Sequence, residues 1–290
     1  MIIIKLLRVK HWIKNLFLFI PLFFAGELFI SLYYFDLLLG FISFCFIASA
    51  IYIINDYKDI EADKKHPEKK NRPLASGKVS IKTGFIVFFT LVCLSAGIAL
   101  FLDVYFFLIV LSYLLINIGY SLGLKNFSIL DIFMVASGFL LRVVAGGLLA
   151  HVSVSQWLII MVFLLAIFLG LAKRRDDILM FKASGMVIRK ASQHYNLEFT
   201  NACLTMLSAI IFVAYLMYTI SDEVIERFHS EYVYCTGIFV LAGLIRYLQI
   251  TLVENNSGSP TKILFSDKFI RITLVGWILM FYVIIYMHRF

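Results

Sequence analysis

Long apolar runs separated by polar connections dominate the chain. Nine of these runs are about 20 residues long, the length that an α-helix needs to cross the hydrocarbon core of a bilayer. The predicted spans cover residues 15–32, 36–55, 83–101, 104–121, 128–149, 156–172, 199–220, 232–250 and 270–288. The pattern predicts an all-α polytopic membrane protein with about nine transmembrane helices, in which residues 1–290 form a single domain.

Composition supports this prediction. The chain is 62% hydrophobic and only 15% charged, whereas soluble domains carry about 25% charged residues. Basic residues and Trp12 precede the first apolar run, which lacks a small-residue cleavage pattern, so we expect a span there and not a signal peptide. The four cysteines lie within or at the ends of apolar runs without metal-ligand spacing, which favours a packing role.

The distribution of positive charge predicts the topology. Two connections are long and polar, at residues 56–82 and 173–198, and both lie on the side of the N-terminus. That side carries 23 of the 26 Lys and Arg residues; Arg227 and Arg289 lie on the other side and Arg142 within a span. The positive-inside rule therefore places the N-terminus and both connections in the cytoplasm and the C-terminus outside, in a bacterial-type plasma (inner) membrane.

The same charge pattern bears on partners. The cations lie at membrane ends and no soluble nucleic-acid-binding module is present, so we expect the bilayer, and no nucleic acid, as a partner. The assembly state is left open, and a homo-oligomer is among the alternatives.

Three aspartates follow the second span at a helical spacing. If this helix continues past Asn55, then Asp56, Asp59 and Asp63 fall within an arc of about 60°. Carboxylates on one face repel one another unless a cation intervenes, and such hard oxygen ligands suit Mg²⁺. The alternative is a solvated loop whose acids balance its lysines.

A family resemblance accompanies this spacing. The motif N-D-x-x-D-x-x-x-D at residues 55–63, followed by Asn71-Arg72-Pro73-Leu74, resembles the first motif of the UbiA superfamily of intramembrane prenyltransferases. The resemblance implies nine helices around a central polar cavity that opens to the cytoplasm. It also implies that Mg²⁺ holds a diphosphate leaving group, with Asp56, Asp59 and Asp63 as its ligands.

The second motif of most family members, D-x-x-x-D after the sixth span, is absent. Residues 172–180 read AKRRDDILM. Other segments resemble the polyprenyl-phosphate phosphoribosyltransferase branch: R-V-K-H-W-I-K-N at 8–15, D-K-K-H-P at 63–67, and Y-S-L-G-L-K at 120–125. This branch implies transfer of 5-phosphoribose from phosphoribosyl pyrophosphate to a polyprenyl phosphate, with loss of pyrophosphate.

Several polar residues at the cytoplasmic ends of the spans are candidates for the site. Besides the three aspartates, Lys14 and Lys173 are expected to be catalytic. The candidates for substrate binding are Asn15, Asn55, Arg72, Tyr120, Lys125, Asp131, Arg142, Arg174 and Asp177. Three anionic groups in the two substrates would require several Lys and Arg side chains. For Lys14 and Asn15, anchoring at the membrane interface is the alternative, and for Asp177 both metal and ribose binding remain open.

The fifth span carries two ionisable residues on one stripe. Asp131 and Arg142 are eleven residues apart and therefore lie within about 20° of each other around a helix. Ionisable residues inside a span usually face a polar cavity or a partner. Asp131 is expected to bind ribose hydroxyls or a lysine, and Arg142 to anchor a phosphate or pair with a carboxylate. Gly138, Gly146 and Gly147 are expected to permit close helix packing.

Two other functions remain open from the sequence. One is an aromatic-acceptor prenyltransferase that uses a prenyl diphosphate and has a degenerate second motif. The other is a transporter of an anionic lipid or metabolite, which would explain the spans and Arg142 but not the aspartate spacing.

Overall fold

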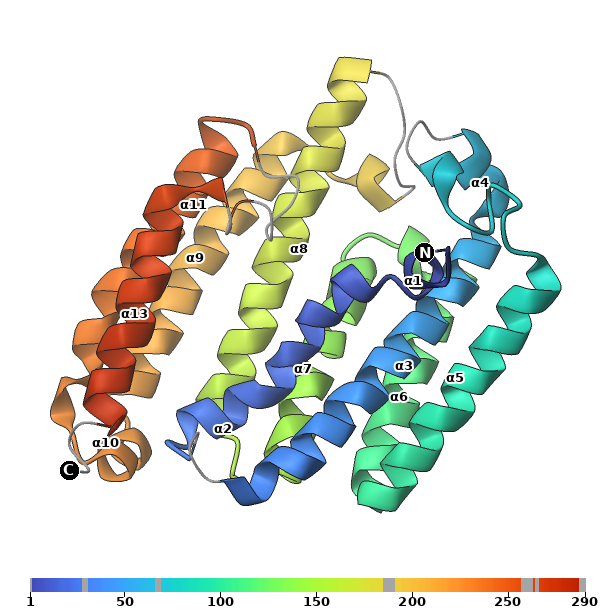
Figure 1. Cartoon of the computed structure of the whole chain (residues 1–290). Coiled ribbons are helices and arrows are strands. Elements are labelled where there is room, and N and C mark those ends of the chain that lie inside the picture. The colour runs from blue at the N-terminus through green and yellow to red at the C-terminus, as the bar shows by residue number, and fades with distance from the viewer. Residues whose placement is uncertain are drawn as a thin grey trace. The chain divides into compact units, whose positions relative to one another are not determined.

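The computed structural model describes residues 2–27, 31–65, 69–184, 191–256, 263 and 266–286. Every regular element in these ranges is a helix (Figure 1). Within the described ranges, seven helical segments are long and apolar enough to cross a membrane. Many of their large apolar side chains are exposed, among them Phe89, Phe101 and Val213. Such a surface is the expected one for helices that face lipid.

The chain forms two compact units. Unit one comprises Met1–Lys125 and Gly138–Val154, and unit two comprises Asn126–Ser137 and Ser155–Phe290. The single transmembrane domain stays a prediction.

Unit one is built around the long helix α3. Its elements are α1 (Ile2–Leu7), η1 (Val9–Phe19), α2 (Ile20–Phe24), η2 (Ser31–Tyr33), α3 (Tyr34–Lys58), α4 (Ile60–Lys65), η3 (Lys69–Asn71), α5 (Ile81–Leu102), α6 (Val104–Leu122) and most of α7 (Leu130–Leu149). Helix α3 packs against α5, α6 and η1 (Figure 1). Phe44 and Phe106 are fully buried in its apolar core and meet edge to face.

In unit two, each long helix packs on the next long helix of the chain. Its elements are α8 (Gln156–Ser184), η5 (Ala191–His194), α9 (Leu197–Thr219), α10 (Asp222–Phe228), η6 (Glu231–Thr236), α11 (Gly237–Leu252) and α13 (Lys268–Tyr286), with the start of α7. Helix α8 packs on α9, α9 on α11, and α11 on α13 (Figure 1).

A polar residue, Asp103, defines the end of α5 and the start of α6. Asp103 has an extended backbone (φ −166°) that ends α5. Its carboxylate accepts hydrogen bonds from the N–H groups of Tyr105 and Phe106 at 2.7 and 3.0 Å, and so caps α6. Asp103 is thus the single residue that connects α5 to α6.

The predicted spans agree with the observed helices at seven places. The first predicted span corresponds to the 3₁₀ segment η1 and the short α2, and the ninth to α13; neither is among the seven candidates, so the number nine stays a prediction. The predicted end of the sixth span at residue 172 is wrong as a helix end, because α8 continues to Ser184. The drop in hydropathy there comes from charged residues. These can continue a helix when they form ion pairs one turn apart, as Arg174 and Asp177 do.

Gly146 allows the backbone of η1 to approach α7. A Cβ atom at residue 146 would lie 1.9 Å from the carbonyl oxygen of Leu18. At Gly147 a Cβ atom would lie 2.2 Å from a Val154 methyl group, and at Gly138 it would lie 3.2 Å from the Tyr113 ring. The prediction that these glycines permit close packing is confirmed most strongly at Gly146, where backbone meets backbone.

The substitution Gly146→Ala should destabilise the protein. The added methyl group meets a main-chain oxygen that cannot move alone, so we expect a loss of about 1–3 kcal/mol in the free energy of unfolding. The measurement is reversible unfolding in mixed micelles. Gly97→Ala is the matched control, since nothing lies within 4 Å of a Cβ atom there; it should be neutral or slightly stabilising. Equal effects of the two substitutions would contradict the packing argument.

Candidate active site

The aspartates of the first motif lie among cations at the end of α3. Asp56 is 1% exposed. Its Oδ1 accepts hydrogen bonds from Arg8 Nη2 and, at 3.1 Å, from Arg72 Nη1. The same Arg72 nitrogen donates to Asp63 Oδ2 at 2.6 Å. One guanidinium therefore holds Asp56 and Asp63 together, and both carboxylates are nearly excluded from solvent.

Asp59 departs from this pair. Helix α3 ends at Lys58, and Asp59 has φ −98° and ψ 6° before α4 begins at Ile60. Its carboxylate accepts a hydrogen bond from Lys125 at 2.6 Å, and the same Lys125 ammonium lies 3.4 Å from Asn55 Oδ1. The expectation of one uninterrupted helix is thus wrong at residue 59. The structure brings together Asp56 and Asp63, and directs Asp59 to a cation of the segment after α6.

The cluster of Asp56, Asp59 and Asp63 is electrically balanced by Arg8, Arg72 and Lys125. Each carboxylate makes its ion pairs through a single oxygen: Oδ1 of Asp56, Oδ1 of Asp59 and Oδ2 of Asp63. Among the described residues no three His, Cys, Asp or Glu side chains converge as a ready metal site. Hard oxygen donors that keep one oxygen outside their ion pairs nevertheless match the ligand chemistry of Mg²⁺.

Arg142 forms a second cluster inside unit one. It is 5% exposed and donates to Asn15 Oδ1 at 2.7 Å, to the Gly138 carbonyl at 2.6 Å and to Tyr113 OH at 2.8 Å. Its guanidinium lies 5.6 Å from the centre of the Phe44 ring. All of these partners are neutral, so the expected carboxylate partner is not found in the described part of the chain. The expected phosphate-anchoring role stays a prediction.

Other predicted residues of unit one lie near Arg142 or near Lys14. Lys14 is partly buried and lies within electrostatic reach of Arg8, Arg142 and Tyr120. Tyr120 is partly buried near the end of α6. Asn15 is 1% exposed and also donates to Cys45 Sγ at 3.2 Å. Asn15 therefore belongs to the interior of unit one, whereas Lys14 is only partly buried, and the roles predicted for both residues stay predictions.

Unit two holds the residues of the second predicted region. Asp131 is fully buried and Arg174 is 3% exposed. Arg174 donates from Nε to Asp131 at 2.7 Å and from Nη1 to Asp177 at 2.6 Å. Asp131 was expected to meet ribose or a lysine; here its partner is an arginine. Lys173, one residue earlier on α8, is exposed.

Two residues that the sequence did not single out complete this cluster. Ser192 donates to Asp177 Oδ2 at 3.1 Å. Tyr195 OH accepts from the N–H of Ile129 at 2.5 Å and lies 3.4 Å from Asp131 Oδ1. Burial raises the pKa of Tyr195 to about 12, so its hydroxyl remains a hydrogen-bond donor at neutral pH. Neither residue follows a motif or a periodic pattern, and no sequence signal points to them.

Arg8 pairs with Asp56 but was not among the predicted site residues. It has a left-handed backbone (φ 51°) between α1 and η1 and lies over the Tyr52 ring at 4.8 Å. Its place in the R-V-K-H-W segment was a usable signal. His66 and Pro67 of the D-K-K-H-P segment lie outside the described residues.

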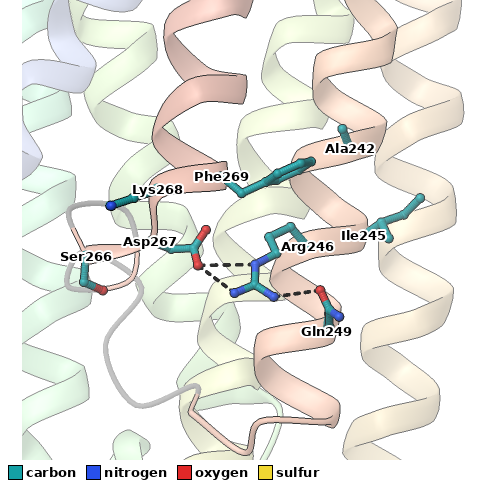
Figure 2. Close-up of a pocket in the computed structure, with 8 residues that line it drawn as sticks. All are labelled: Ala242, Ile245, Arg246, Gln249, Ser266, Asp267, Lys268 and Phe269. Carbon is teal, nitrogen blue, oxygen red and sulfur yellow. Dashed lines mark hydrogen bonds and ion pairs between the residues drawn. The ribbon is translucent and has the colours of Figure 1, made fainter.

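A groove of about 780 Å³ lies elsewhere in unit two, between α11 and the start of α13. Figure 2 shows Arg246 in it, bound to Asp267 and Gln249. Arg246 also pairs with Glu254 at 2.8 Å. None of the predicted site residues lines this groove, and its arginine is already balanced by two carboxylates.

The helices and the buried aspartate–arginine clusters define a polytopic membrane protein with polar sites inside its helix bundles. The sequence profile of the UbiA prenyltransferase family matches residues 16–270. The chain therefore belongs to the UbiA prenyltransferase family, and the predicted family and enzyme class, a transferase, are confirmed. It is a multi-pass membrane protein.

Curated relatives match nearly the whole chain. A decaprenyl-phosphate phosphoribosyltransferase of Mycolicibacterium smegmatis is 30% identical over 95% of this chain and 90% of the relative. One of Corynebacterium glutamicum is 29% identical over 95% of this chain and 84% of the relative. The structure of a UbiA homologue from Archaeoglobus fulgidus bound to GPP and Mg²⁺ superposes with a TM-score of 0.73 at 21% identity, covering 98% of this chain and 99% of that one. This last likeness shows the fold.

Breaking the buried pair of Asp131 and Arg174 should destabilise unit two strongly. Arg174→Gln leaves a buried carboxylate without its nearest cation, so we expect a loss of about 3–5 kcal/mol in the free energy of unfolding. The double variant with Asp131→Asn should lose less than the sum of the single variants. Arg227→Gln is the control, because its partner Glu223 is 51% exposed and such pairs contribute about 0–1 kcal/mol. Additive losses would contradict the pairing.

Proposed function

We propose that the protein transfers 5-phosphoribose from phosphoribosyl pyrophosphate to a polyprenyl phosphate. A lipid phosphate oxygen attacks the anomeric carbon, and the bond from that carbon to the pyrophosphate oxygen breaks. Pyrophosphate leaves with the electron pair, and polyprenyl-phosphoryl-5-phosphoribose forms. The phosphate nucleophile is already anionic at neutral pH, so no dedicated general base is required.

The carboxylate cluster of Asp56, Asp59 and Asp63, lined by cations, carries this proposal. These three residues, flanked by Asn55, would hold Mg²⁺ through the oxygens that their ion pairs leave over. When bound, Mg²⁺ neutralises the oxygens of the departing pyrophosphate. Arg72 and Lys125 already touch these carboxylates, and they would bind the same pyrophosphate by charge-assisted hydrogen bonds.

The other cations would receive the remaining phosphate groups. Lys14 and Arg142 have no carboxylate partner in the described part of unit one, which favours binding of a substrate phosphate by this pair. Lys173 and Arg174 would bind the 5-phosphate. Asn15, Tyr120, Asp131 and Asp177 would position the substrates, the last two through ribose hydroxyls.

The relatives support the donor and acceptor classes. Two proteins named decaprenyl-phosphate phosphoribosyltransferase match 95% of this chain, and K-R-R-D-D replaces the second D-x-x-x-D motif. We further propose that the site faces the cytoplasm of a bacterial-type inner membrane, with the C-terminus outside, since positive charge gathers at the ends of the spans on the N-terminal side. A homo-oligomer is compatible with this arrangement.

The direct test is synthesis of the labelled lipid. Purified protein with Mg²⁺, labelled phosphoribosyl pyrophosphate and polyprenyl phosphate should give labelled polyprenyl-phosphoryl-5-phosphoribose, and a chelator should abolish the product. No labelled lipid would contradict the proposal. Transfer from a prenyl diphosphate to an aromatic acid, without any response to phosphoribosyl pyrophosphate, would select the prenyltransferase alternative. Mg²⁺-independent flux across vesicles would select the transporter.

Neutralising a single motif carboxylate should remove turnover and keep the fold. For Asp56→Asn or Asp59→Asn we expect kcat to fall by at least on the order of 10²-fold, since one stabilising group at the developing charge is lost. Glu61→Gln is the control, because Glu61 pairs with Lys64 on the exposed face of α4. Unchanged rates for both aspartate variants, measured on protein with wild-type melting temperature, would contradict the metal role.

A further inference from the structure

Arg175 has surroundings unlike those of its neighbour Arg174. It is 3% exposed, and it donates from Nε to Asn201 Oδ1 at 2.7 Å and from Nη2 to Asn255 Oδ1 at 2.8 Å. Both acceptors are neutral amide oxygens. Burial of a charge without a counter-charge costs several kcal/mol. A guanidinium that has only amide partners among the described residues therefore indicates an anion that binds beside it.

Three buried donors near this arginine lack hydrogen-bond partners in the described part of the chain. They are Arg175 Nη1, Tyr247 OH and Thr251 Oγ1. Thr251 is fully buried and Tyr247 is 8% exposed. Buried polar atoms are nearly always paired with protein, water or an ion. Three orphan donors in one region therefore point to an acceptor that lies between them.

The three donors share one seam between α8 and α11. Tyr247 and Thr251 are four residues apart and lie on one face of α11, and Asn255 follows the end of this helix at Leu252. The Tyr247 ring lies 5.3 Å from the Phe168 ring on α8. Seven residues further along α8, Arg175 reaches Asn255. Phe168 and Arg175 of α8 therefore follow Tyr247 and Asn255 in the same direction, and the seam runs from buried Tyr247 to exposed Asn255.

The chemistry of the seam suits an oxyanion. The amide oxygens of Asn201 and Asn255 face the guanidinium, which leaves their NH₂ groups as additional donors. We propose that the seam lined by Arg175, Thr251 and Tyr247 binds a phosphate group, from inorganic phosphate or from the phosphate monoester headgroup of a lipid. The exposed Asn255 marks its opening. None of these residues belongs to the proposed transfer site, so this binding stands apart from the proposed function.

Asp176 is the competing internal counter-ion. Its charge acts on both Arg175 and Tyr247, yet it accepts no hydrogen bond from either in the described structure. If the seam takes an external anion, Asp176 repels that anion, and Asp176→Asn should strengthen phosphate binding. If Asp176 is itself the counter-ion, the same substitution should destabilise the protein without increasing its response to phosphate.

The test is the melting temperature of the full-length protein in phosphatidylcholine nanodiscs, without Mg²⁺, as inorganic phosphate is added. At 100 times Kd we expect a rise of roughly 5–10 °C. A second arm uses nanodiscs that contain phosphatidic acid and no free phosphate. A rise in the first arm assigns the site to free phosphate, and a rise confined to the second assigns it to a lipid headgroup.

Variants of the seam decide whether the rise comes from this site. Arg175→Gln should abolish it, and Arg246→Gln, an arginine of the same unit with two carboxylate partners, should retain it. Thr251→Val and Tyr247→Phe keep the shape of the seam and should weaken the response at least threefold in Kd, so they decide the matter if Arg175→Gln does not fold. No rise in either arm, or an equal rise in the folded seam variants, would overturn the proposal.

Discussion

Compensation of buried carboxylates by arginine and lysine is the constraint on which both units depend. Asp56 and Asp131 are almost completely excluded from solvent, and an isolated carboxylate cannot remain ionised there at tolerable cost. Arg8 and Arg72 meet the first, and Arg174 meets the second. Because these cations come from distant segments of the chain, the ion pairs also fix the segment before η1, the segment around η3 and the middle of α8.

The same balance of charge bears on the proposed binding of Mg²⁺ and pyrophosphate. Around Asp56, Asp59 and Asp63 the charges of cations and carboxylates cancel, so a divalent cation alone would upset the balance. In the proposed function, a pyrophosphate would bring negative charge to the two arginines and the lysine, and the carboxylates would then be available to hold Mg²⁺. Arg142, whose described partners are all neutral, instead offers a positive charge that a substrate phosphate can neutralise.

Much of this architecture was predictable from the sequence. Seven helices follow from apolar runs of bilayer length, which are a local pattern, and the family was indicated by the resemblance of the N-D-x-x-D-x-x-x-D segment to a known motif. The pairing of Arg72 with Asp56 and Asp63 was not predictable, because it is a tertiary contact between a residue that follows η3 and carboxylates at the end of α3 and in α4. The extension of α8 to Ser184 was missed since hydropathy marks the membrane edge and not the end of a helix. Ser192 and Tyr195 enter through tertiary contacts alone.

Isothermal titration with Mg²⁺, alone and with saturating pyrophosphate, tests the central claim that the carboxylate cluster is charge-balanced until an anion arrives. We expect binding of Mg²⁺ alone to be weak, with Kd on the order of 1 mM or above. Pyrophosphate should tighten it at least tenfold beyond the affinity of the two in solution, a coupling of about 1.4 kcal/mol. Asp56→Asn should remove this coupling. Equally tight Mg²⁺ binding with and without pyrophosphate would contradict the account.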